Sequence, residues 1–111
     1  MAFEKACALA DVTEEAALAV TLGRYDVAVA RDGDEVFAIE NTCSHAAVAL
    51  SEGEVADGTV ECWLHGSCFD LRTGKPTHLP ATEPVAIFPV EVRGTDVYVD
   101  TETTLNGVTP Q

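Results

Sequence analysis

The sequence predicts a mostly β protein, built as a small antiparallel barrel or sandwich. Two pairs of segments alternate between apolar and polar residues, and a period of two is typical of half-buried strands. The pairs are residues 25–31 with 35–40, and residues 87–93 with 95–100. Asp32-Gly33, a strong hairpin signal, joins the first pair, and the second pair turns around Arg93-Gly94. Together these segments should form the base of the fold.

The N-terminal part of the chain supplies two further expected strands. Residues 2–9 predict a first strand, with Phe3 as a core residue. The acidic stretch after Asp11 resembles a helix start, but we expect only a short turn there, followed by a strand over residues 17–22. Gly23 should end that strand.

A chain of 111 residues is expected to form one domain with a modest core. We expect this domain to cover residues 1–104, with an inserted subdomain over about residues 41–84. Short strands over residues 59–63 and 69–71 lie within the insertion. The polar, small residues at the end predict a flexible tail over 105–111.

The charge balance excludes some partners. The chain carries 19 acidic and 6 basic residues, for a net charge of −13. Nucleic-acid binding is therefore not expected, because phosphate contacts need Lys and Arg. Two explanations of the acidic surface remain open and carry similar weight: steering toward a basic partner, or solubility alone.

The apolar residues predict no membrane association. The chain has no run of eighteen apolar residues, and its start lacks a basic region followed by an apolar stretch. We therefore expect a soluble, cytoplasmic protein, and a monomer.

Two short loops carry the residues that indicate chemistry. Cys43-Ser44-His45 and Cys62-Trp63-Leu64-His65 each pair one Cys with one His, with sixteen residues between His45 and Cys62. Structural zinc sites of the finger type group two Cys and then two His. Mixed pairs make sense if two metals lie side by side, so that each loop sends its Cys to one metal and its His to the other. A zinc site, or a chance pairing of Cys and His, is the alternative.

The segment from Cys43 to Leu79 resembles a Rieske ferredoxin. Residues 62–74 carry the Cys-x-x-His-Gly-Ser-x-Phe-Asp run of that family, and by likeness the resemblance covers nearly the whole chain. It implies a Rieske-type fold with one [2Fe–2S] cluster in the inserted subdomain. It also implies the ligands: Cys43 and Cys62 on the inner iron, and His45 and His65 on the outer iron that takes up the electron.

The resemblance also assigns residues around the cluster. Ser67 matches a position whose hydroxyl donates to a bridging sulfide, and Gly66 should allow the backbone to approach the cluster closely or adopt a positive φ. From its residue type alone, Trp63 is expected as a core anchor under the second loop rather than as an electron relay. Pro80 lies in a proline-containing loop that covers the cluster from a third side.

The same comparison implies a reduction potential at the low end of the Rieske range. Phe69 stands where high-potential members have a Tyr that donates to a ligand Cys. Val48 and Leu64 stand at the two positions of the disulfide that joins the loops in those members. The missing disulfide fits a reducing cytosol. Of the two spare cysteines, Cys7 and Cys68, we expect Cys68 to be a small buried hydrophobe.

A catalytic oxygenase is not expected. It would need a second iron site with two His and a carboxylate, and His78, expected as a solvent-facing residue, is the one histidine left. The chain resembles the ferredoxin component of bacterial aromatic-ring-hydroxylating dioxygenase systems. This implies an electron carrier between a flavin-dependent reductase and a terminal oxygenase. Iron–sulfur cluster assembly and nitrite reduction are alternative roles for the same cluster, and a non-redox zinc-binding interaction module is the alternative of another class.

Overall fold

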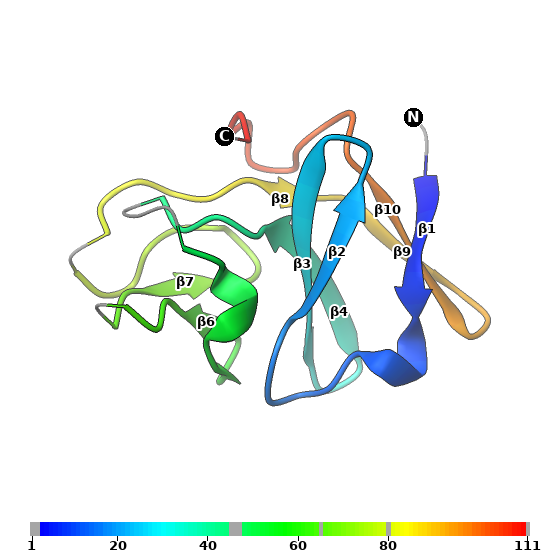
Figure 1. The fold of residues 1–111 in the computed structure, drawn as a ribbon, viewed down its shortest axis with the longest axis horizontal. Coiled ribbons are helices and arrows are strands. Elements are labelled where there is room, and N and C mark those ends of the chain that lie inside the picture. Colours follow the sequence, from blue (N-terminus) through cyan, green and yellow to red (C-terminus); the bar gives the residue numbers. More distant parts are fainter. Residues whose placement is uncertain (1–2, 45–47, 65, 80, 111) are drawn as a thin grey trace.

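The computed structural model describes residues 3–44, 48–64, 66–79 and 81–110. Within these residues the fold is mostly β, as the alternating segments predict, and its strands form three antiparallel sheets (Figure 1). The orders are β1-β10-β9, β2-β3-β4-β8 and β5-β6-β7. The described residues contain no helix that is long and apolar enough to cross a membrane.

The first two sheets form the base. Their strands are β1 (Phe3–Ala8), β2 (Leu18–Leu22), β3 (Tyr25–Asp32), β4 (Glu35–Glu40), β8 (Ile87–Phe88), β9 (Val90–Arg93) and β10 (Asp96–Asp100). A short 3-10 turn, η1 (Leu9–Asp11), follows β1. Val27 and Val29 of β3 pack with Val97 and Val99 of β10 in one buried cluster, so the base core lies between the two sheets.

Strand β3 is buried on both faces. Successive side chains of a strand point to opposite sides, and Val27 and Val29 face the base core. Ala28 and Ala30 belong to a second buried cluster, which includes Phe69. Because alanine side chains are small, the other residues of this second cluster can pack close to this face of the sheet.

The second cluster belongs to a smaller subdomain, which lies between β4 and β8 in the sequence. This subdomain contains η2 (Leu50–Glu52), β5 (Val55–Ala56), β6 (Thr59–Glu61) and β7 (Cys68–Asp70). Strands β4 and β8 pair directly, with Ile39 opposite Ile87. The chain therefore leaves the base sheet after β4 and returns to the same place. Figure 1 shows β6 and β7 at the end of the molecule away from β1.

The segment over residues 87–93, predicted as one strand, is two. Strand β8 pairs with β4, whereas β9 pairs with β10 in the other sheet. Pro89 separates them, and proline cannot donate a ladder hydrogen bond. The carbonyl of Pro89 accepts from the amide of Asp100 at 3.1 Å, so the chain changes sheets there.

Two other expectations differ from the structure in detail. Phe3 is half-buried rather than a core residue, and its ring lies under the Arg93 guanidinium, 5.6 Å from the centroid. The turn expected after Asp11 lies earlier, as η1.

The end of the chain contacts the body. The amide of Leu105 donates to the carbonyl of Ile87 at 2.8 Å. The side-chain amide of Asn106 donates to the carbonyls of Thr73 and Val85, at 3.0 and 2.8 Å. The sequence predicts a flexible tail over residues 105–111 and does not indicate these contacts, because the accepting carbonyls belong to residues far away in the sequence.

We predict that Gly53→Ala destabilises the protein strongly. A Cβ at Gly53 would overlap the backbone carbonyl of Glu61, where η2 meets β6. The backbone there is extended, at φ −92°, so the expected loss of stability comes from steric overlap alone. Urea unfolding followed by circular dichroism should show that the free energy of unfolding falls by about 3 kcal/mol.

Gly23→Ala is the matched control. Gly23 has φ +62° with nothing within 4 Å of an added Cβ, so this change adds left-handed backbone strain of only about 1 kcal/mol. Equal losses for the two variants would contradict the steric explanation.

Candidate metal centre

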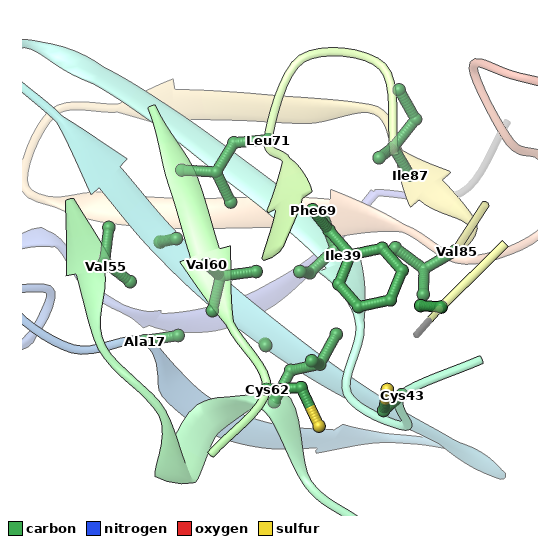
Figure 2. Packing of buried hydrophobic residues seen from close by; sticks show 14 residues of the cluster. Ala17, Ile39, Cys43, Val55, Val60, Cys62, Phe69, Leu71, Val85 and Ile87 are labelled. Atoms are coloured by element: carbon green, nitrogen blue, oxygen red, sulfur yellow. The ribbon is translucent and has the colours of Figure 1, made fainter. Parts of the chain in front are cut away.

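The structure brings two of the four candidate ligands together. Cys43 follows β4 and Cys62 follows β6, and their exposed fractions are 1% and 0%. Both belong to the buried cluster of the subdomain, and Figure 2 shows their sulfur atoms at the same end of that cluster. His45 and His65, the other two candidates, lie outside the described residues, and so does Pro80.

The first loop is closed at its base. Thr42 and Ala49 form an isolated antiparallel bridge, and the amide of Cys43 donates to the carbonyl of Val48 at 3.0 Å. The buried side chain of Asn41 accepts from the amide of Ser51 at 2.8 Å, which holds the loop against η2. The position of Cys43 is therefore set by hydrogen bonds on both sides of the loop.

The second loop closes on itself in the same way. The amide of Cys62 donates to the carbonyl of Ser67 at 2.6 Å, and the amide of Gly66 donates to the carbonyl of Cys62 at 3.0 Å. Gly66 has φ +77°, which confirms the expected positive φ at this glycine. Its own amide serves the loop, so this N–H is directed at Cys62 and not at a bound group.

The chain that follows β7 forms a third side of the candidate site, beside the two cysteine loops. Pro76 forms a bridge with Phe69, and the amide of Thr77 donates to the carbonyl of Cys68 at 2.7 Å. The amide of Ala81 donates to the hydroxyl oxygen of the fully buried Ser67 at 3.0 Å. Because Ser67 accepts this bond, its hydrogen can still be donated to another group.

The expectation for Trp63 is wrong. Its side chain is 50% exposed, and the neighbouring Leu64 is 39% exposed. The closure between Cys62 and Ser67 leaves these two residues at the outward tip of the loop. Phe69 is instead the aromatic residue in the core, and Figure 2 shows its ring in the middle of the buried cluster. Burying such a ring contributes about 3 kcal/mol.

Other exposed side chains surround this end of the molecule. Leu79, on the third segment, is 77% exposed. His78 is exposed as expected, and its Nδ1 lies 3.0 Å from the hydroxyl of Thr77. The structure therefore supports a solvent-facing position for His78.

None of the four cysteines forms a disulfide. Cys68, expected to be buried, is partly exposed. Burial raises the pKa of the Cys68 thiol, and the nearby Glu61 carboxylate raises it further. Burial also raises the pKa of Cys7, with Asp11 and Asp96 adding to the effect. Both thiols are thus less ionised at neutral pH than an ordinary cysteine.

Sequence reasoning missed the side chains that join distant segments around the site. The Ser44 hydroxyl donates to the carbonyl of Glu83 at 2.6 Å. The buried Glu40 carboxylate accepts from the amide of Ala86, also at 2.6 Å. The partners are 39 and 46 residues apart, so no local pattern could have indicated them.

Arg72 joins the subdomain to the base. Its guanidinium forms ion pairs of 3.1 Å with Asp32 and Glu35 and lies 4.9 Å from the centroid of the Phe37 ring. Hydrogen bonds to Glu35 and Asp32 raise the pKa of Arg72. Because all three charged groups are exposed, this link orients the subdomain more than it stabilises the fold.

The donor set suits a soft metal centre. Two buried cysteines from separate loops, neither of them in a disulfide, lie in the same cluster of apolar side chains. Thiolates are preferred by zinc, copper(I) and iron–sulfur clusters, and an apolar shell keeps water from such a centre. The described residues therefore fit one half of a cluster site.

Comparison with known proteins agrees with this assignment. A model of the family described as the Rieske [2Fe-2S] domain matches residues 2–89. The ferredoxin subunit of anthranilate 1,2-dioxygenase from Burkholderia cepacia is 46% identical over 85 residues, which cover 77% of this chain and 79% of the relative.

Solved structures show the same similarity. The ferredoxin of carbazole 1,9a-dioxygenase from Nocardioides aromaticivorans IC177 superposes with a TM-score of 0.84 at 38% identity, covering 89% of this chain and 97% of that one. A complex of reduced oxygenase and oxidised ferredoxin in carbazole 1,9a-dioxygenase contains a chain with a TM-score of 0.81 at 39% identity, covering 87% of this chain and 91% of that one.

We predict that thiol-specific alkylation of the native protein separates the cysteines into two classes. Cys7 and Cys68 should react slowly at neutral pH and faster as the pH rises, because their raised pKa values leave little thiolate at pH 7. Cys43 and Cys62 should react only after unfolding, because they are buried. Peptide mass spectrometry after iodoacetamide treatment measures each site. Modification of Cys43 or Cys62 in the native state, at the rate of Cys68, would contradict the burial.

Proposed function

The chain belongs to the Rieske [2Fe-2S] domain family, and we propose that it is a one-electron carrier that supplies a terminal oxygenase of the aromatic-ring dioxygenase type. The observation that carries this proposal is its similarity, over most of both chains, to ferredoxin subunits of such dioxygenases. One solved relative is a ferredoxin in complex with its oxygenase. A flavin-dependent reductase is the proposed electron donor.

We assign the cluster ligands as Cys43 and Cys62 on one iron and His45 and His65 on the other. Support comes from the two buried thiols at one end of the core and from the spacing of the His residues. The cluster, when bound, accepts and releases one electron. Neutral imidazoles in place of two thiolates make the site less negative, which raises its potential above the value of about −400 mV for plant-type ferredoxins.

The residues around the proposed cluster site exclude water from it and provide a hydrogen-bond donor toward it. Phe69, Leu50 and Val85 pack in the same buried cluster as the two thiols. The Ser67 hydroxyl, with its hydrogen unused by the Ala81 contact, is the proposed donor toward the cluster. Phe69 has no hydroxyl, so it cannot add a second donor, and this favours the low end of the Rieske potential range.

A carrier role fits the residues better than catalysis. Once the four ligands are assigned, His78 is the last histidine in the chain, and its side chain is exposed beside Thr77. A mononuclear iron site with two His and a carboxylate therefore cannot be assembled from this chain alone.

The proposed contact surface for the oxygenase is formed by Trp63, Leu64 and Leu79. These are three exposed large apolar side chains, and they lie on the second loop and the third segment. Exposed apolar groups beside the proposed ligand loops can be covered by a partner, and exposed apolar patches commonly mark protein–protein contacts.

Metal analysis and electron paramagnetic resonance test the cluster. We expect two irons and two acid-labile sulfides per chain, and a rhombic signal averaging below g = 2 after reduction. Cys62→Ser should lose the cluster, because the second thiolate is removed. Cys7→Ser is the matched control and should keep it, since Cys7 packs in the base core. One zinc per chain would overturn the assignment.

A potentiometric titration of the same protein should give a midpoint nearer −150 mV than +300 mV, the approximate limits of the Rieske range. A midpoint above about +100 mV would contradict the reasoning about Ser67 and Phe69.

Leu79→Asp should impair electron transfer to a terminal oxygenase that the wild-type protein reduces. We expect about a tenfold rise in the ferredoxin concentration for half-maximal oxygen uptake, the scale of one apolar anchor at an interface. Leu105→Asp is the control, since Leu105 is also exposed, at 65%, but lies against β8. Equal effects of the two changes would show that Leu79 is not at the contact.

A further inference from the structure

The described residues of 78–84, in the connection from β7 to β8, lie at the end of the molecule that carries both ligand loops. Ala81 and Val85 share the buried cluster of Cys43 and Cys62, and Figure 1 shows this connection in yellow at the end that holds β6 and β7. Backbone hydrogen bonds flank it: Thr77 N–H to Cys68 C=O at 2.7 Å, and Val85 N–H to Gly74 C=O at 2.9 Å.

Between these two anchors, the described residues of 78–84 make no backbone–backbone hydrogen bond. A segment without strand or helix pairing depends on side chains to hold its position.

Two serine hydroxyls hold the middle of this segment. The Ser44 hydroxyl donates to the carbonyl of Glu83 at 2.6 Å. The Ser67 hydroxyl oxygen accepts from the amide of Ala81 at 3.0 Å. Ser44 directly follows Cys43, and Ser67 closes the loop that begins at Cys62 (with Cys62 N–H bonded to Ser67 C=O). Each ligand loop thus contributes one hydroxyl.

One segment is bonded to both ligand loops. Ser44 of the first loop binds Glu83, and Ser67 of the second loop binds Ala81, two residues earlier. No disulfide joins the loops. Segment 81–83 therefore connects them without a covalent bond.

We propose that Ser44 is a positioning residue. Together with Ser67, it clamps residues 81–83 onto the two ligand loops, keeps the loops at a fixed separation, and closes the route by which water reaches Cys43 and Cys62. Ser44 touches neither a sulfur nor a metal in this role. The inference deepens the proposed function and rests on its assignment of the two loops as ligand loops.

The test compares two changes of nearly the same shape in the cluster-loaded protein. Ser44→Val removes the hydroxyl, whereas Ser44→Thr keeps it. Hydrogen–deuterium exchange of residues 81–83, read by mass spectrometry, reports opening of the segment. Loss of visible absorbance in the presence of an iron chelator reports release of the cluster.

We expect Ser44→Val to increase both rates about tenfold, the scale of one lost hydrogen bond. Ser44→Thr should stay close to the wild type. Ser51→Ala is the matched control in the adjoining turn η2, because Ser51 binds Asn41 through its backbone amide, and it should change neither rate.

Unchanged exchange at residues 81–83 in Ser44→Val would overturn the proposal. So would a similar increase in β3 and β4, since that would indicate general destabilisation. If the valine prevents folding, Ser44→Ala removes the same hydroxyl with a smaller side chain and is judged by the same comparison. The exchange measurement does not require iron, so a chain found to hold zinc would overturn the proposed function while residues 81–83 still test the clamp.

Discussion

The structure depends on the burial of β3 on both faces. Its valines, Val27 and Val29, close the core between the two base sheets. Its alanines, Ala28 and Ala30, contact the subdomain core. A larger side chain on the alanine face would hold the subdomain away from the sheet, because protein cores tolerate little extra volume. One strand thus joins the base to the subdomain that carries the two proposed ligand loops.

The two loops that carry Cys43 and Cys62, the proposed ligands, show how a short irregular segment can fix the position of a cysteine. Each loop closes through hydrogen bonds near its own cysteine, at Val48 for Cys43 and at Ser67 for Cys62. Closure of a short loop costs little chain entropy, and the ordered backbone needs few apolar contacts of its own. The separation between the two loops depends instead on the proposed clamp in the connection from β7 to β8.

Trp63 and Phe69 show where residue type was a poor guide to position. Both are large aromatic residues in the second loop or next to it, and both are candidates for burial. Phe69 lies on β7, where alternation points it inward, and Trp63 lies at the tip of a closed turn. Backbone geometry, and not hydrophobicity, decides which of them fills the core. The exposed indole then becomes available to a partner.

Patterns along the chain were sufficient to predict the β class, the hairpins at Asp32-Gly33 and Arg93-Gly94, and the positive φ of Gly66. These features are local: side-chain alternation and backbone preference act over a few residues. The spacing of Cys and His indicated two metals side by side, and the resemblance to Rieske ferredoxins implied the four ligands and the cluster.

Packing between distant segments decided the rest. The change of sheet at Pro89 and the bond from Ser44 to Glu83 each depend on a partner far away in the sequence. A serine hydroxyl can bond to any carbonyl within reach, and the fold alone determines which carbonyl that is.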